Sequence, residues 1–390
     1  MSSPVYRSGW PFVKRDSSLL ALPPIFRLSI VLYAMRLFLL ACLFLSGTYL
    51  ATAQSPSPDP VVDFLRTYPT RSALYLIRND TVLISQRPDQ KMPLASAVKT
   101  IIAIEFAQQA AAGKIDPNER IPLTDVDLYY LPNTDGGAHP AWKQRLAQQN
   151  LISNGTVPLL DVAKGMIMFS SNANTEYLLD RLGPKAVNAN LKTLKLPNHD
   201  QIYPIVAALM LYSAAPADSA KAAKAVRSLS ANAYAARCQA IHEQLKNDRS
   251  GAYKQGFIFP DMNLQKSWSD RLPGSTVREY ASVMQKIISR TYFPTAVQTV
   301  LDSIMEWPFV ANPGNKDVYK HLGMKGGSTA FVLTNAFYAE TTKGNRVAAA
   351  VFFNNLTAAE FSLLSKELNN ITIRCISKAQ SAALAAALVK

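Results

Sequence analysis

The stretch from residue 93 to residue 113, PLASAVKTIIAIEFAQQAAAG, most constrains what this chain can fold into. Its alanine, isoleucine and phenylalanine side chains predict a buried helix, yet Lys99 lies near the start of that helix, three residues after Ser96. A lysine in an apolar setting costs free energy unless a partner or a reaction uses its amine. The segment therefore predicts a core helix that carries a functional polar pair.

Ser96 and Lys99 have the chemistry of a nucleophile and its base. The i, i+3 spacing puts both side chains on one helix face. A serine hydroxyl becomes a good nucleophile when a neighbouring base accepts its proton, and a desolvated lysine can be that base if its pKa is lowered by burial or by another cation. Because S-x-x-K often arises by chance, an exposed lysine in a first helical turn is the alternative.

Two later segments favour the catalytic interpretation. Ser170-Ser171-Asn172 is a polar group between two apolar helical runs in MFSSNANTEYLL. Lys325-Gly326-Gly327-Ser328 lies on a predicted strand, where two glycines would let a substrate backbone lie along the strand edge. His321 precedes Lys325 by an even interval, and we expect it to have a packing role, with a position facing the cleft as the alternative.

Strands are predicted at both ends of the chain, with helices between them. ALYLIRNDTVLISQR predicts two strands around Asn79-Asp80, and three strands and a final helix follow residue 318. We therefore expect an α+β fold, in which an antiparallel sheet from both chain ends is flanked by helices and receives a helical insertion. Residues 54–92 plus 305–390 are predicted to form the sheet domain, and residues 93–304 the helical domain with the S-x-x-K and S-x-N motifs.

The three motifs, in this order, resemble those of the penicillin-recognising serine hydrolases, S-x-x-K, S-D-N and K-T-G. The resemblance covers roughly residues 58 to 385 and is nearest to the class A β-lactamases. It implies that Ser96 is the acylated nucleophile and Lys99 its proton acceptor. It also implies that Ser170 relays a proton to the leaving nitrogen and that Lys325 supplies positive charge and helps to anchor a carboxylate.

The resemblance also implies a set of substrate contacts. Asn172 would hold the substrate amide, and the backbone N–H groups of Ser96 and Ser328 would form the oxyanion hole. His139 lies in the loop DGGAHPAW and is expected either near the mouth of the cleft, against substrate, or in a loop-stabilising role. The predicted substrate-binding residues are Asn172, Gly327, Ser328, Thr329 and His139.

The sequence departs from this family pattern at three places. Ser171 replaces the usual aspartate of the second motif, and Gly326 replaces the usual threonine of the third, where Ser328 or Thr329 would have to compensate. The segment LKTLKLPNHDQIYPIVAALML lacks the glutamate with which class A β-lactamases activate the deacylating water. His199 and Asp200 are the candidates for that task, and a polar turn after Pro197 is the alternative.

Residues 1–53 are predicted to be a leader. The apolar run from about residue 35 ends in Ala51-Thr52-Ala53, which is typical of a signal peptide that is cleaved after Ala53. Residues 1–34 contain charges and Pro-Pro, so Met35 is an alternative start, and a lipoprotein anchor at Cys42 is a further alternative. We expect a periplasmic or secreted protein.

The net charge and the cysteine content restrict the kinds of binding partner that we expect. The leader takes five of the 41 basic and one of the 27 acidic residues, so the formal charge falls from +14 to +10. Such a charge favours anionic cell-wall polymers, while export argues against nucleic acid. Pairing of Cys238 with Cys375 is left open, no spacing resembles a zinc site, and we expect no metal, no cofactor and a monomer.

The leading hypothesis is an exported serine hydrolase of the class A β-lactamase type, which opens β-lactams through a Ser96 acyl-enzyme. The first alternative is a penicillin-binding-protein-like D-alanyl-D-alanine peptidase, or another amide or ester hydrolase, because the deacylating glutamate is missing. The second alternative is a non-catalytic module that binds the cell wall. The intact Ser96, Lys99 and Lys325 argue against that last function.

Overall fold

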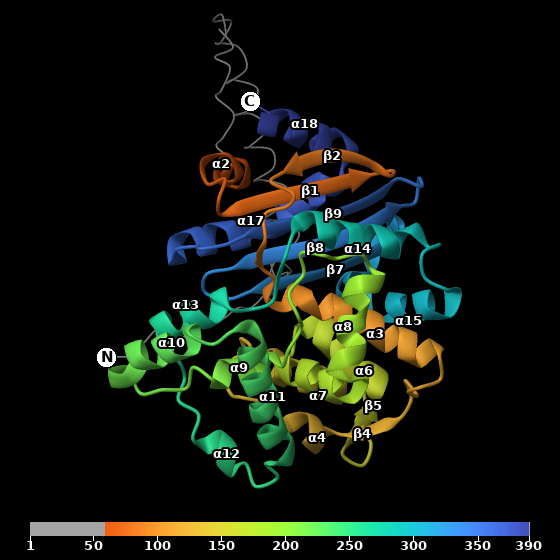
Figure 1. The fold of residues 1–390 in the computed structure, drawn as a ribbon. Coiled ribbons are helices and arrows are strands. Elements are labelled where there is room, and N and C mark those ends of the chain that lie inside the picture. Colours follow the sequence, from red (N-terminus) through yellow and green to blue (C-terminus); the bar gives the residue numbers. More distant parts are fainter. Residues whose placement is uncertain (1–58, 390) are drawn as a thin grey trace, which may run out of the picture. The chain divides into compact units, whose positions relative to one another are not determined.

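A computed structural model of the protein describes residues 59–389, so the predicted leader lies outside the described residues. A five-stranded antiparallel sheet contains strands from both ends of the described chain (Figure 1). The strands in spatial order are β2 (Thr81–Gln86), β1 (Ser72–Arg78), β9 (Arg346–Phe353), β8 (Leu333–Thr341) and β7 (Tyr319–Ser328).

The first hairpin shows why these residues form strands. Asn79 and Asp80, between β1 and β2, both have positive φ angles, 46° and 64°. Asparagine and aspartate tolerate this conformation better than most residues, and two such residues in succession make a turn whose twist suits a hairpin. The side chains of β1 then alternate between two cores, with Ala73, Tyr75 and Ile77 on one side of the sheet and Leu74 and Leu76 on the other.

Helices cover both faces of the sheet (Figure 1). One face packs against α14 (Val277–Ser289), which contacts β1, β8 and β9. The other face packs against α2 (Pro60–Thr67), α17 (Ala358–Ile376) and α18 (Lys378–Val389). The predicted α+β class, with a sheet built from both chain ends and flanked by helices, is confirmed.

The remaining elements form the helical part of the protein. Two short strand pairs join β3 (Met92–Pro93) to β6 (Gly274–Ser275) and β4 (Arg120–Pro122) to β5 (Thr156–Pro158). The other elements are η1 (Ala95–Val98), α3 (Lys99–Ala111), α4 (Leu123–Asp127), α5 (Ala138–Gln148), α6 (Leu159–Lys164), η2 (Gly165–Phe169), α7 (Asn172–Leu182), α8 (Pro184–Thr193), α9 (Ile205–Met210), η3 (Pro216–Asp218), α10 (Ser219–Arg227), α11 (Ala231–Asn247), α12 (Ala252–Gln255), α13 (Met262–Asp270), α15 (Thr295–Met305), α16 (Pro308–Ala311) and η4 (Pro313–Asp317).

The helix α3 is the centre of this part. Its first nine residues, 99–107, are all buried, and it contacts α7, α8, α15 and η2.

The helix α14 packs on the sheet although it lies within residues 93–304, and the division into a sheet domain and a helical domain stays a prediction. Cys238 and Cys375 are both buried free thiols. Within residues 59–389, none of the helices has the length and apolarity needed to cross a bilayer.

Candidate active site

Ser96 lies in η1, the single 3₁₀ turn that precedes α3. The residue before it, Ala95, has a φ of +47°, a conformation that costs an L-residue about 1 kcal/mol or more. Packing holds the turn, because Thr334 Oγ1 on β8 donates to the Leu94 carbonyl at 2.9 Å. Ser96 is half-buried, and its Oγ makes no hydrogen bond to any residue in the described part of the chain, so the hydroxyl is open to a substrate.

Lys99, the first residue of α3, is fully buried. Its Nζ donates to the Ser170 carbonyl and to Asn172 Oδ1, both at 2.7 Å, and lies 3.3 Å from Ser170 Oγ. A neutral amine has two N–H bonds and one lone pair. The two short hydrogen bonds can therefore be kept while the lone pair accepts a proton, which is what a general base must do.

The electrostatic environment favours this neutral amine. Burial first, and then the positive charge of Lys325, hold the pKa of Lys99 well below its ordinary value, and the charges of Asp135 and Glu176 oppose the shift. Burial also lowers the pKa of Lys325 to about 7. The structure thus places two buried lysines close together and makes deprotonation of each easier than it is in water.

Ser170 lies between the two lysines. It follows η2, which is a π-helix, and its own backbone is left-handed, with φ 68° and ψ 25°. Lys325 Nζ donates to Ser170 Oγ at 2.9 Å and to the Gly326 carbonyl at 2.9 Å. A π-turn and a left-handed residue are irregularities that often occur at functional sites, and here they bring the Ser170 hydroxyl to both lysines.

The strand β7 approaches the Ser96 turn closely, and a glycine permits this approach. A Cβ atom on Gly327 would lie 2.5 Å from the Ser96 nitrogen and 2.6 Å from the Leu94 oxygen, distances at which backbone must move. Ser328, the next residue, is exposed at the end of β7. Thr329 Oγ1 is hydrogen-bonded to Ser269 Oγ at 2.7 Å. The predicted residues of β7 are therefore next to the Ser96 turn.

Ser171 and His139 lie behind the site. Ser171 is buried, caps α7 by accepting from the Asn174 N–H, and lies 3.0 Å from His139 Nδ1. His139 Nε2 donates to Asp127 Oδ1 at 2.7 Å, and the ring stacks on Tyr130. Because His139 is only 1% exposed, it supports Ser171 from behind the second motif. His139 lies in the first turn of α5 and lines a cavity together with Asp127, Tyr130 and Lys143, and its direct contact with substrate stays a prediction.

The two candidate bases for deacylation are hydrogen-bonded to residues outside the three motifs. His199 is hydrogen-bonded through Nε2 to Tyr280 Oη at 3.0 Å and through Nδ1 to the Asp200 carbonyl. Asp200 accepts from the Gly274 N–H at 2.9 Å and forms an ion pair with Lys91. These contacts hold the segment after Pro197 against β6, which is the role expected of a structural polar turn.

The sequence motifs do not single out Glu176 on α7, four residues after Asn172. Its carboxylate is fully buried, accepts from the Ala207 N–H at 2.9 Å, and lies 3.2 Å from His242 Nδ1. Burial lowers the pKa of His242, but hydrogen bonds to Asp180 and Glu176 outweigh it and raise that pKa to about 9. The signal was present in the sequence, because Glu176 is a carboxylate on the apolar side of a predicted helix.

The sheet, the Ser96–Lys99 turn and the two further motifs define a penicillin-recognising serine hydrolase fold. The chain matches the family model of the beta-lactamase enzyme family over residues 62–384, and it belongs to this family. No curated protein sequence matches the chain.

Several solved structures are similar to the protein. A structure of PBP-A is 18% identical, with 76% of this chain and 87% of that chain covered and a TM-score of 0.46. A representative of the class A β-lactamases from Bacteroides cellulosilyticus is 15% identical, with 85% and 98% covered and a TM-score of 0.48. A β-lactamase from Sphaerobacter thermophilus is 17% identical, with 73% and 83% covered and a TM-score of 0.45.

Proposed function

We propose that the protein is an exported serine hydrolase that is acylated on Ser96 by β-lactams. The observation that carries this proposal is the placement of Ser170 Oγ, 2.9 Å from Lys325 Nζ and 3.3 Å from the buried Lys99 Nζ, beside the Ser96 turn. Two amines of lowered pKa and two hydroxyls are the groups that acyl transfer to serine requires. A pure binding module would have no need of them.

In the proposed reaction, Lys99 takes the proton of Ser96 as Oγ attacks the β-lactam carbonyl. The backbone N–H groups of Ser96 and Ser328 stabilise the oxyanion, a contribution of about 3 kcal/mol per donor in other acyl-transfer enzymes. Ser170, polarised by Lys325, passes a proton to the ring nitrogen as the C–N bond breaks. Asn172, whose Oδ1 binds Lys99, keeps its amide N–H₂ for the substrate.

A second candidate function is a penicillin-binding-protein-like D-alanyl-D-alanine peptidase. It is favoured by the contacts of His199 and Asp200, because both side chains are held by Tyr280, Gly274 and Lys91 and, within residues 59–389, neither is hydrogen-bonded to a catalytic motif. With no carboxylate supplied from that segment, hydrolysis of a β-lactam acyl-enzyme should be slow. PBP-A, a mutant of which has been solved as an acyl-enzyme complex with penicillin G, is one of the similar structures.

Export is proposed on the leader pattern that ends at Ala51-Thr52-Ala53. The formal charge of +10 after cleavage supports association with anionic cell-wall polymers, where D-alanyl-D-alanine peptides occur. We propose that the protein acts there as a monomer.

The test of the proposed function is a time course with a penicillin. The mass of the intact protein is followed together with the absorbance of the β-lactam ring, for the wild type and for Ser96→Ala. The proposal expects an adduct with the mass of the intact penicillin on the wild type and none on the variant. Rapid ring loss with little adduct identifies a β-lactamase, and a persistent adduct identifies the peptidase-like enzyme. No adduct and no ring loss would exclude β-lactam chemistry.

A further inference from the structure

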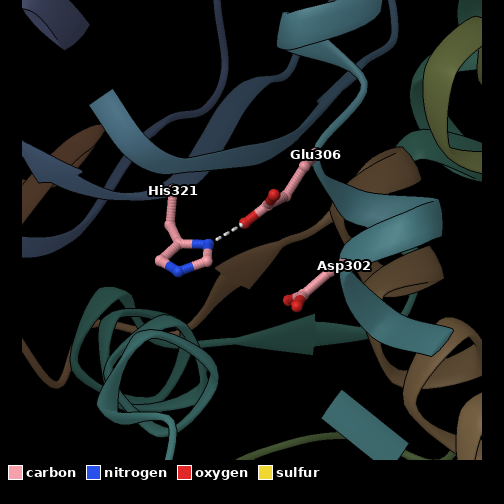
Figure 2. Close-up of side chains that lie close together, drawn as sticks. All are labelled: Asp302, Glu306 and His321. Atoms are coloured by element: carbon pink, nitrogen blue, oxygen red, sulfur yellow. Dashed lines mark hydrogen bonds and ion pairs between the residues drawn. The ribbon is translucent and has the colours of Figure 1, made fainter. Parts of the chain in front are cut away.

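Outside the catalytic motifs, three potential metal ligands meet between α15 and β7. Asp302 lies on α15, Glu306 follows one turn later at its end, and His321 lies on β7 (Figure 2). Each residue offers one ligand atom, and the three atoms lie within 4.8 Å of one another. His321 Nδ1 is already 2.8 Å from Glu306 Oε1, and all three side chains are largely shielded from solvent.

The charges around the three ligands leave a role for a cation. Arg290 Nη1 and Nη2 donate to the two oxygens of Asp302 at 2.5 and 2.6 Å, which balances that carboxylate. Among residues 59–389, no arginine or lysine forms an ion pair with Glu306, whose side chain is only 14% exposed. His321 offers a ring nitrogen as a metal ligand.

A separate observation comes from Tyr338 on β8. Its side chain is fully buried, and its hydroxyl has no hydrogen-bond partner among residues 59–389. Tyr338 pairs with Gly323, two residues after His321 on the same face of β7, and its ring covers the space where a Cβ of Gly323 would lie. Tyr338 therefore lies on the same side of the sheet as His321, with its hydroxyl against Gly323. A buried hydroxyl without a partner is costly, and a bound water would relieve that cost.

We propose that Asp302, Glu306 and His321 bind one divalent cation of the zinc class, with Tyr338 Oη bonded to a water in the fourth position. One imidazole nitrogen and two carboxylate oxygens suit zinc, whereas Mg²⁺ and Ca²⁺ prefer oxygen ligands alone. Arg290 supports Asp302 from outside, as hydrogen-bond donors commonly do for ligating carboxylates. The spacing of Cys and His along the chain does not predict this site, because its ligands come from two separate elements.

The cation would link two elements of the active site. His321 and Lys325 lie four residues apart on β7, and α15 contacts both β7 and α3, which begins with Lys99. Fixing the end of α15 to β7 would therefore hold the strand that carries Lys325 in register against the helix that carries Lys99. We expect the site to be structural and the protein to be more heat-stable when zinc is bound.

The test is calorimetric titration of zinc sulfate into purified protein that has been treated with a chelator. We expect one equivalent to bind with a Kd of about 10 µM or tighter. Glu306→Gln and His321→Gln, which alter different elements, should each weaken binding by about 100-fold or more. His199→Gln is the matched control, since it changes a buried histidine far from the cluster in sequence and should leave zinc affinity unchanged. Zinc should raise the melting temperature of the wild type and of the control only.

Circular dichroism shows whether each variant is folded. A crystal of the wild type grown with zinc tests the site without any variant. An anomalous peak between α15 and β7 at the zinc absorption edge would support the proposal. An absence of stoichiometric binding, equal affinity in both variants and the control, or a peak only at another place would overturn it.

Discussion

Lys325 Nζ donates a hydrogen bond of 2.9 Å to Ser170 Oγ, although the two residues lie 155 positions apart. The lysine comes from an edge strand of the sheet and the serine from a left-handed residue at the end of a π-helix. The bond joins the sheet to the helical part at the place where the backbone of β7 also meets the Ser96 turn. In the proposed reaction, the Ser170 hydroxyl therefore couples proton transfer to substrate anchoring.

Replacement of Lys99 tests its role as the base. Lys99→Arg keeps the positive charge, but a guanidinium stays protonated at any pH that a protein tolerates. The rate of acylation by a penicillin should fall by about 10²- to 10⁴-fold, which is the usual contribution of general-base catalysis. Lys91→Arg is the control, because Lys91 is an exposed lysine paired with Asp200 and its variant should acylate normally. Equal rates for both variants would remove Lys99 from the mechanism.

The pKa of Lys325, about 7, predicts how pH acts on substrate preference. Below this pH Lys325 is charged and attracts a substrate carboxylate, and above it the amine becomes neutral and the attraction is lost. The ratio of acylation rates for a penicillin and for its methyl ester should therefore fall as pH rises from 6 to 9, by about tenfold or more. Titration of Lys99 changes the acylation rates of both compounds alike, so its effect cancels in the ratio. A ratio that does not change with pH would contradict the anchoring role.

Ser171, which stands where this motif usually has an aspartate, caps α7 and contacts His139. Ser171→Ala removes a helix cap and the hydroxyl that lies 3.0 Å from the buried His139 Nδ1, which keeps only Asn174 Oδ1 at 3.2 Å. Each effect costs about 1 kcal/mol or more, so the free energy of unfolding should fall by about 2 to 3 kcal/mol. Ser230→Ala, which removes the exposed cap of α11, should cost about half as much. Urea unfolding of both variants measures the difference, and equal losses would show that the His139 contact contributes nothing.

Gly327 is required by the distance between β7 and the Ser96 turn. A methyl group there would meet three backbone atoms at 2.5 to 2.7 Å, so Gly327→Ala must push the strand away from the nucleophile. Acylation should fall by about 100-fold, because small displacements of reacting groups are costly. Gly326→Ala is the matched control, since the atom nearest to its new Cβ would be the Thr334 backbone oxygen at 3.3 Å. A Gly326 variant that loses as much activity as the Gly327 variant would contradict this account.

The fold was predictable wherever residues close together in the sequence form a regular pattern. The alternating strands around Asn79-Asp80, the buried helix after Ser96 and the three closing strands could all be predicted from periodicity and turn residues, and the structure contains each of them. The packing of α14 on the sheet was not predicted, because a helix between residues 93 and 304 gives no local signal of the element it will cover.

The candidate site was predictable where its residues are close in sequence. The proximity of Ser96 and Lys99 follows from helix geometry, whereas the contacts of Ser171 with His139 and of Glu176 with His242 join elements that only the tertiary structure brings together. The same reason applies to Asp302, Glu306 and His321. The positions of His199 and Asp200 likewise depend on Tyr280 and Gly274, which are more than 70 residues further along the chain.

We expect Ser96 to be the residue that becomes acylated. The most direct measurement is mass spectrometry of tryptic peptides after the protein reacts with a penicillin. Cleavage after Lys91 and Lys99 releases the peptide MPLASAVK, whose only hydroxyl side chain belongs to Ser96. We expect this peptide, isolated after the reaction is stopped with acid, to carry the penicillin mass. An adduct on any other peptide, or a protein that stays unmodified while the β-lactam stays intact, would contradict this expectation.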